Sequence, residues 1–270
     1  MNRPQTSGSK SLALFSLEGR VALITGAAGG FGSAIALGFA QSGADLAITD
    51  IDIGGLNRLS SDLAPLKRRV FSRELNVMKE SALQQVVDEA RQQLGRIDIL
   101  IHIAGLARLS PVAEMSTKDF DFTIASHLRG TFFMTRAVGA AMLEQGGGSI
   151  VLMSSIASER ALGRGTGAYA AAKAGINALV RELAVEWAAQ RIRVNAVAPC
   201  QFLTPGLRNR LKDPQFNPAG DLEQKMISAI PANRLGEPHE IVGPCLFLAS
   251  DAASMVTGHV LFVDGGYTAR

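Results

Sequence analysis

The stretch TGAAGGFG, residues 25–32, decides the fold because it lies between two different patterns. Before it, RVALITG (20–26) is apolar, rich in β-branched residues and closed by a glycine, which predicts a buried strand. After it, apolar residues recur at helical spacing from about Phe31 to Ser42. A glycine-rich turn between a strand and a helix predicts the first unit of an α/β fold.

The glycines of this turn predict a site for a dinucleotide cofactor. Gly26 permits the tight turn, whereas Gly30 and Gly32 let the backbone approach a pyrophosphate, with Phe31 between them in the same site. The phosphates would bind the free N–H groups at the positive end of the helix. A flexible loop of small residues is the alternative, but the spacing of the glycines and their position after a strand argue against it.

Asp50 indicates which dinucleotide is bound. It ends the next apolar run, ADLAITD (44–50), and follows Gly32 by 18 residues. A carboxylate there accepts a hydrogen bond from the 2′-OH of the adenosine ribose and repels a 2′-phosphate. The glycine-rich turn has no Lys or Arg to hold that phosphate. We therefore predict NAD rather than NADP, with a solvated Asp at the end of a strand as the alternative.

Short apolar runs alternate with longer amphipathic segments along the chain. Continuous apolar strands joined by helices are typical of a parallel sheet, which right-handed crossovers make doubly wound. We predict an α/β fold with a single doubly wound parallel sheet, a Rossmann fold, and helices on both faces. Further strands are expected at 68–75, 97–105, 148–155, 192–199 and 259–266, and further helices at about 54–64, 79–94, 117–144, 167–190 and 238–250.

Two segments fall outside this alternation. Residues 1–17 carry only a short, broken apolar run and are predicted to be a mobile N-terminal tail, too weak for a signal peptide. Residues 200–235 are rich in proline and polar residues and too long for an ordinary connection, which predicts a substrate loop or lid. The chain from 18 to 270 is predicted to form one domain.

The composition narrows the possible partners. A chain of 270 residues, 47% hydrophobic and 19% charged, can bury one large core. Its net charge of +3 is scattered and aromatic residues make up 6%, so we expect no nucleic-acid partner. No apolar run is long enough to span a membrane, and no membrane partner or metal is expected. Cys200 and Cys245 give no disulfide framework, which suits a reducing cytoplasm.

Tyr169 and Lys173, in GAYAAAKAG (167–175), form a candidate acid–base pair. Their spacing of four places both side chains on one face of a helix. An ammonium beside a phenol stabilises the phenolate and lowers its pKa, as a general base for alcohol oxidation requires. Ser154 and Ser155 end the preceding strand, where a hydroxyl can donate to a substrate oxygen that gains negative charge. The tyrosine–lysine spacing alone is a weak signal, and the serines could simply cap a strand.

Together these residues resemble the short-chain dehydrogenase/reductase family over about residues 18–267. The resemblance rests on TGAAGGFG, YAAAK, RVNAVAP followed by TP at 204–205, and RLGEPHEIVGPCLFLASDAASMVTGHVLFVDGG near the C-terminus. It implies that Ser155 and Tyr169 are catalytic, and that Lys173 binds the nicotinamide ribose and lowers the pKa of the tyrosine. It also implies a homotetramer that pairs the helices at 117–144 and 167–190 across one interface.

The resemblance extends to the cofactor pocket and marks where this chain departs from the family. Asn195 and Pro199 would shape the nicotinamide pocket, with Thr204 near the carboxamide or the phosphates. The family's Pro-Gly is here Pro199-Cys200. HIAG (102–105) replaces Asn-Asn-Ala-Gly, so Ala104 and Gly105 remain for the adenosine side. Asn76-Val77 replaces Asp-Val at the adenine, where the asparagine can still form a hydrogen bond.

The fourth departure is His127, in TIASHLRGTFF (123–133). Leu128, Gly130 and Phe132 set a register in which His127 occupies the position of the family's catalytic asparagine, which holds a water that links the lysine to solvent. A histidine can hold a water through either ring nitrogen and titrates near pH 6.5 when unperturbed. We therefore include His127 among the catalytic residues as a proton relay. A buried structural histidine is the alternative.

Three functions remain open on these grounds. The first is an NAD(H)-dependent oxidoreductase that interconverts a secondary alcohol and a ketone. Its substrate would be a sugar, polyol or hydroxy acid, because Arg108, Arg160, Arg164 and His127 would make the pocket polar. The second is a 3-oxoacyl-thioester reductase, which Asp50 disfavours because such reductases commonly use NADP. The third is a catalytically silent NAD-binding protein, against which the intact Ser155, Tyr169 and Lys173 argue.

Overall fold

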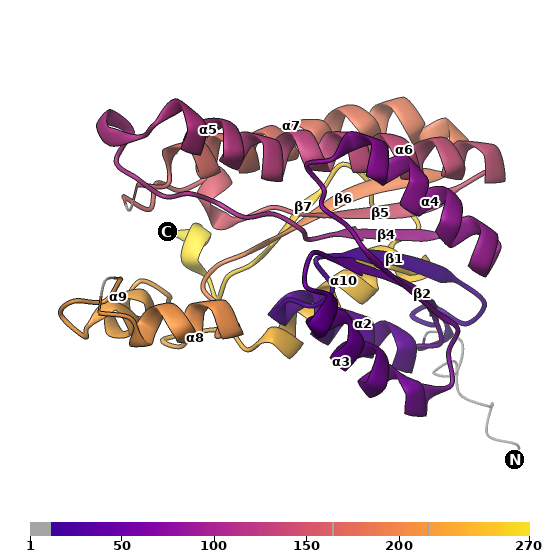
Figure 1. The fold of residues 1–270 in the computed structure, drawn as a ribbon, viewed down its shortest axis with the longest axis horizontal. Coiled ribbons are helices and arrows are strands. Elements are labelled where there is room, and N and C mark those ends of the chain that lie inside the picture. Colours follow the sequence, from indigo (N-terminus) through magenta and orange to yellow (C-terminus); the bar gives the residue numbers. More distant parts are fainter. Residues whose placement is uncertain (1–11, 164, 215) are drawn as a thin grey trace, which may run out of the picture.

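The computed structural model describes residues 12–163, 165–214 and 216–270. At its centre is one parallel sheet of seven strands in the order β3-β2-β1-β4-β5-β6-β7 (Figure 1). The chain starts in the middle, moves outward to β3, and returns past β1 to build the other half, which is the predicted doubly wound arrangement. The strands are β1 (Val21–Thr25), β2 (Asp45–Asp50), β3 (Val70–Glu74), β4 (Ile99–His102), β5 (Gly148–Met153), β6 (Ile192–Pro199) and β7 (Val260–Val263).

Helices cover both faces of the sheet, as the continuous apolar strands require (Figure 1). On one face, apolar side chains of α4 (Glu80–Leu94), α6 (Gly130–Gln145) and α7 (Gly167–Trp187) pack on the strands. The other face is covered by α2 (Gly30–Gln41), α3 (Ile53–Leu63) and α10 (Val242–Ala249). The predicted fold class is confirmed.

The helix predicted over 117–144 has a wider turn in its interior. It consists of α5 (Thr117–Ile124), a π-helical turn (Ala125–Arg129) and α6, with helical backbone angles at both junctions. An i→i+5 turn inserts an extra residue, and such turns are frequent at functional sites. His127 lies in the middle of this turn.

The segment 200–235 contains two helices, α8 (Pro205–Lys212) and α9 (Leu222–Ser228), where the sequence predicted irregular structure. The start of α8 carries signals that the prediction overlooked. Thr204 is its N-cap and accepts a hydrogen bond from the N–H of Leu207 at 3.3 Å, and Pro205 is its first residue. Both helices pack around a small core of Met226, Ile230 and Leu235. The predicted loop is therefore a structured cover beyond the ends of the strands (Figure 1).

The predicted tail extends too far along the chain. Leu17 is buried, and its N–H donates to the carbonyl of Ser42 at 2.8 Å. The carbonyl of Leu14 accepts from the N–H of Ala252. Leu17 therefore packs on the folded domain and Leu14 is bound to it through its backbone, whereas the side chains of residues 12–16 are exposed. Residues 1–11 of the predicted tail lie outside the described residues.

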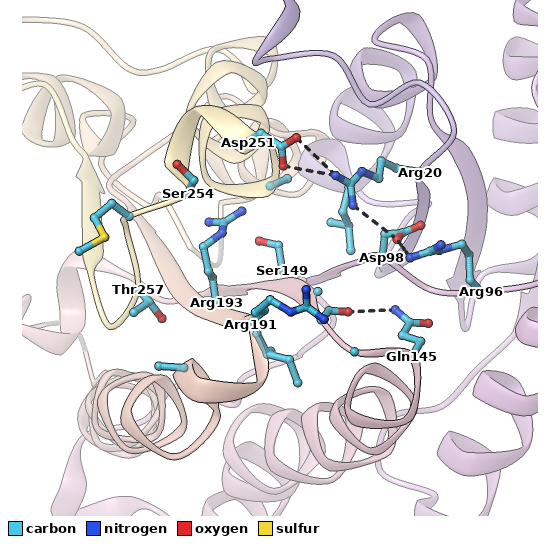
Figure 2. A pocket seen from close by; sticks show the side chains of 18 residues that line it. Arg20, Arg96, Asp98, Gln145, Ser149, Arg191, Arg193, Asp251, Ser254 and Thr257 are labelled. Carbon is cyan, nitrogen blue, oxygen red and sulfur yellow. Dashed lines mark hydrogen bonds and ion pairs between the residues drawn. The ribbon is translucent and has the colours of Figure 1, made fainter.

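Charged residues at the amino edge of the sheet hold strands and helix ends together around a cavity of about 720 Å³ (Figure 2). The buried carboxylate of Asp98 pairs with Arg96 at 2.6 Å and Arg20 at 3.7 Å, and it accepts from the N–H of Val21 at 2.9 Å. Arg193 donates to the carbonyls of Leu248 and Ser250 at the end of α10. Because helix C-termini present unpaired carbonyls, this arginine neutralises a partial negative charge that the fold creates.

None of the helices in the described ranges combines the length and the hydropathy that a membrane-spanning segment needs. The described residues also contain no group of three or more His, Cys, Asp or Glu side chains that could hold a metal ion.

Candidate active site

The predicted site residues meet at the carboxyl edge of the sheet. Asp50 and His102 end β2 and β4, Ser155 follows β5, and Tyr169 and Lys173 lie in the first two turns of α7. In an open parallel sheet, ligands bind at this edge, where the strand order reverses. Here the reversal falls between β1 and β4.

The glycine-rich turn forms a cradle that side chains would fill. Gly26 has a φ of +70°, and a Cβ there would lie 2.9 Å from the backbone nitrogen of Ala104. A Cβ at Gly30 would lie 2.8 Å from Pro205 at the start of α8, and one at Gly32 would overlap the carbonyl of Gly26. Only glycines allow this close approach of three chain segments. The cradle, which opens at the N-terminus of α2, fits a pyrophosphate.

Asp50 is held in place above this cradle. One of its carboxylate oxygens accepts from the N–H of Ala28, and the other from the N–H of Asp52, both at 3.0 Å. Its register partner on β3 is Glu74. Residues in register on neighbouring strands point to the same side of the sheet, so Glu74 lies on the same side as Asp50. The carboxylate of Asp50 is placed to accept a hydrogen bond from a ribose hydroxyl.

The other predicted cofactor residues surround the same edge. The ring of Phe31 packs edge-on against Phe202 with centroids 5.1 Å apart, so Phe31 offers the cradle its backbone. Thr204 lies against Gly30, and the side-chain oxygen of Asn76 accepts from the N–H of Met78. Four further predicted residues, Val77, Ala104, Gly105 and Pro199, lie at or just beyond the ends of their strands.

Tyr169, Ser155 and Lys173 form one buried cluster. The side chain of Ser155 is hydrogen-bonded to the phenol of Tyr169. The ammonium of Lys173 donates to the carbonyl of Met153, the last residue of β5, at 2.6 Å, and lies 5.6 Å from the centroid of the tyrosine ring. A substrate oxygen placed beside the serine and tyrosine hydroxyls would contact both of them.

The two serines have different surroundings. The hydroxyl of Ser154 donates to the side-chain oxygen of Asn177 at 2.6 Å, and the amide of Asn177 donates to Ser158 at 2.8 Å. Ser154 thus belongs to a network that joins β5 to α7. Ser155 is the member of the pair that contacts Tyr169, which supports its assignment to the site.

Burial controls the proton affinities in this cluster. It lowers the pKa of Lys173 to about 7, because the ammonium has lost its hydration. It also raises the pKa of Tyr169 above its ordinary value, although the hydrogen bond with Ser155 acts in the opposite direction. The sequence predicted a lowered tyrosine pKa. The structure differs from that prediction, because burial of the phenol outweighs its hydrogen bond with Ser155.

His127 lies directly beside the tyrosine. Its ring is buried and packs nearly perpendicular to that of Tyr169, with centroids 5.1 Å apart. Both ring nitrogens lack a hydrogen-bond partner among the described residues. Burial, assisted by Lys173 and His102, lowers the pKa of His127 to about 2. The expected titration near pH 6.5 is therefore wrong, and His127 is neutral at physiological pH.

His102 is a neighbour of this cluster that the sequence noted only as a departure. The hydroxyl of Thr25 accepts from the N–H groups of Ile103 and Ala104, so its one proton goes to Nδ1 of His102 at 2.9 Å. Because burial keeps this ring neutral, with a pKa lowered to about 3, its second proton is on Nε2. Nε2 has no partner among the described residues and so leaves a buried donor near the cluster. The signal in the sequence was its position at the end of a central strand.

Three residues assigned to the pocket lie elsewhere or are not described. The amide of Asn195 donates to the carbonyl of Val256 and accepts from the N–H of His259, so it joins β6 to the segment before β7. Arg160 donates to the carbonyl of Thr268 near the C-terminus. Arg164 lies outside the described residues.

Comparisons with known proteins agree with this geometry. The family model described as enoyl-(acyl carrier protein) reductase matches residues 26–268. D-Threitol dehydrogenase of Mycolicibacterium smegmatis is 42% identical over 256 residues, which cover 95% of each chain. A 3-oxoacyl-[acyl-carrier-protein] reductase of Thermotoga maritima is 40% identical over 250 residues, 93% of this chain and 98% of that one.

A solved structure extends the likeness to three dimensions. The 7α-hydroxysteroid dehydrogenase complexed with NADH and a 7-oxo bile-acid derivative superposes with a TM-score of 0.87 at 34% identity, covering 94% of this chain and 96% of that one. The chain belongs to the short-chain dehydrogenase/reductase family. It is an oxidoreductase with a nicotinamide dinucleotide cofactor.

Proposed function

We propose that this protein is an NAD(H)-dependent dehydrogenase that interconverts a secondary alcohol and a ketone on a sugar, polyol or hydroxy acid. The observation that carries the proposal is the buried cluster of Ser155, Tyr169 and Lys173 beside the glycine cradle. When bound, the nicotinamide supplies the hydride chemistry. The dinucleotide would be held by residues at the carboxyl edge of the sheet. They are Gly26, Gly30, Phe31, Gly32, Asp50, Asn76, Val77, Ala104, Gly105, Tyr169, Lys173, Pro199 and Thr204.

The residues of the chain handle the proton and the oxygen. The phenol of Tyr169 exchanges a proton with the substrate oxygen, while the hydroxyl of Ser155 donates to that oxygen as it gains negative charge. Lys173, held by the carbonyl of Met153, places its ammonium below the tyrosine. His127 relays the proton as a neutral ring, because one nitrogen can accept while the other donates.

Asp50 supports NAD over NADP. Its carboxylate is fixed by two backbone N–H groups and lies in register with Glu74. A 2′-phosphate would approach both carboxylates, and like charges at such a distance cost several kcal/mol when desolvated.

The substrate class rests on two observations. The relative at 42% identity is a D-threitol dehydrogenase, which acts on a polyol. Beside the catalytic cluster, His102 and His127 have buried ring nitrogens without a partner among the described residues, which favours a polar substrate. The second candidate is a 3-oxoacyl-thioester reductase, which the likeness to the Thermotoga maritima enzyme favours and the carboxylate of Asp50 disfavours.

An assay of polyols, aldonic acids and acyl thioesters with NAD(H) and NADP(H), on wild type and Tyr169→Phe, tests the proposal. Loss of the phenol should lower kcat by about 10²–10⁴-fold and leave NADH binding intact. Tyr267, the only other tyrosine of the chain, supplies a matched control, and Tyr267→Phe should retain its rate. An undiminished rate in Tyr169→Phe would remove it from the mechanism, and turnover of acyl thioesters alone would favour the second candidate.

We also propose a homotetramer in a reducing cytoplasm. An apolar hollow of about 430 Å³, lined by Leu128, Phe132 and Leu179 among others, lies between α5, α6 and α7, the helices that the resemblance pairs. Phe132 is 47% exposed there, which suits burial against another copy. Sedimentation equilibrium should give four chain masses, and a monomer would contradict the proposal.

A further inference from the structure

A second cavity lies beside the loop that follows β4. Its volume is about 610 Å³, and it is enclosed by the loop after β4, the first turns of α5, and the segment from α8 onward. Arg108, Lys118 and Arg210 line it together with the apolar Phe122 and Phe216. Three cationic side chains from three separate chain segments therefore converge on one hollow.

One chain segment, the loop after β4, lies beside His127 and also lines this cavity. The loop after β4 passes Gly105, which packs against the ring of His127, and then follows the helix outward. The N–H of Leu106 donates to Ser126 at 2.8 Å and that of Arg108 to Thr123 at 3.0 Å. Thr123 precedes His127 by four residues, so the backbone of Arg108 contacts α5 about one helical turn, roughly 5–6 Å along the axis, from His127.

The cations of this cavity differ from Arg20 and Arg96 of the amino edge in having no ion-pair partner among the described residues. Arg96 and Arg20 pair with Asp98, but within the described residues no carboxylate lies within ion-pair distance of Arg108, Lys118 or Arg210. The one carboxylate of the cavity, Asp119, accepts from the hydroxyl of Ser116 at the start of α5. The cavity therefore has an excess of positive charge.

Two of the arginines are held by aromatic rings. The guanidinium of Arg108 lies 5.1 Å from the ring centroid of Phe122, and that of Arg210 lies 5.5 Å from that of Phe216. Stacking on a ring restrains the guanidinium and leaves the N–H groups at its edge free to donate. Those N–H groups have the geometry to bind a carboxylate or a phosphate in two-point fashion.

We propose that this cavity binds an anionic group, a carboxylate or a phosphate, at the far end of the alcohol substrate. The inference rests on the proposed function and narrows its substrate class to sugar acids or sugar phosphates. The carbinol carbon lies at Ser155 and Tyr169, and the anion lies between Arg108, Arg210 and Lys118, a few carbons away. Neutral polyols then bind more weakly because they leave these cations without a partner.

The test compares a neutral polyol, the aldonic acid of the same chain length and the corresponding polyol phosphate as substrates with NAD. Wild type should show a KM at least about tenfold lower for one anionic substrate than for the neutral one. The better of the two anions identifies the group. Raising the ionic strength should raise KM for the anionic substrate and leave that for the polyol unchanged, because salt screens exposed charges.

Arg210→Gln and Arg108→Gln should each raise the KM for the anionic substrate about tenfold, with kcat and the KM for the polyol little changed. Lys67→Gln, which removes an exposed cation outside the cavity, should behave as wild type. Equal KM values of the wild type for all three substrates would overturn the proposal. So would an equal rise in the KM of the variants for charged and neutral substrates.

Calorimetric binding of the same anions to wild type and Arg210→Gln separates this inference from the reaction itself. Arginine-dependent binding without turnover of any alcohol would support the subsite and contradict the proposed function. Turnover of the polyol without arginine-dependent binding of either anion would support the proposed function and contradict the subsite.

Discussion

Polar and charged side chains lie at both edges of the sheet, but the two edges differ in whether these side chains have hydrogen-bond and ion-pair partners. At the amino edge, Asp98 pairs with two arginines and Arg193 is bound to the carbonyls at the end of α10 (Figure 2). At the carboxyl edge, roughly 20 Å away along β5, the ring nitrogens of His127 and Nε2 of His102 are buried without partners. The carboxyl edge, and not the arginine-lined cavity of about 720 Å³, therefore has the unmet hydrogen-bonding capacity that a ligand or an ordered water would satisfy.

The difference follows from the direction of the chain. Helix C-termini gather at the amino edge of a parallel sheet and helix N-termini at the carboxyl edge. Arg20, Arg96 and Arg193 at the amino edge are bound by carboxylates and carbonyls that folding itself places there. Unpaired buried groups cost stability, so their survival at the carboxyl edge indicates a use other than folding.

The largest expected effect is on stability at the amino edge. Asp98→Ala removes the partner of Arg96 and Arg20 and leaves the N–H of Val21 without its acceptor. The free energy of unfolding, measured with urea, should fall by about 3 kcal/mol. The exposed Asp251, also paired with Arg20, is the control, and Asp251→Ala should cost less than about 1 kcal/mol. If Asp98→Ala lost activity under conditions in which it is still folded, the amino edge would also serve function, which would contradict this division between the two edges.

The next effect concerns the choice of cofactor. Asp50→Ser removes the carboxylate that a 2′-phosphate would approach, so the ratio of NADPH to NADH affinity should rise at least about tenfold. Fluorescence titration with both reduced cofactors measures the ratio. Glu74→Gln, one strand further out, should shift the ratio less. Tighter binding of NADPH than NADH by the wild type would show that this reading of Asp50 is mistaken.

The smallest effect concerns the unpaired ring of His127. His127→Asn can still hold a water and should keep its rate within about threefold, whereas His127→Ala should be about tenfold slower. With its pKa lowered to about 2, His127 stays neutral in the assay range. Lys173 loses its proton as the pH rises through about 7, so an inflection of the rate there should persist in His127→Asn. Equal rates in the Asn and Ala variants would make the residue structural.

The sequence predicted most of the fold because its signals are local. The alternation of apolar runs and amphipathic segments places all seven strands, and the turn at 25–32 identifies β1, next to the point where the strand order reverses. The helices at 205–212 and 222–228 were missed because proline and polar residues there resemble a loop, and their small core comes from distant parts of the chain. Leu17 was assigned to the tail because its burial depends on contacts with Ser42 and its neighbours.

For the site, residue types and spacing determined which side chains take part: Ser155, Tyr169, Lys173 and Asp50 all lie at one edge, where the motifs placed them. Only the tertiary structure decided their electrostatic state. Burial raises the pKa of Tyr169 and lowers those of Lys173 and His127, since desolvation depends on how many segments close over a group. The same holds for the cations at 108, 118 and 210, which are scattered in the sequence and line one cavity only in the folded chain.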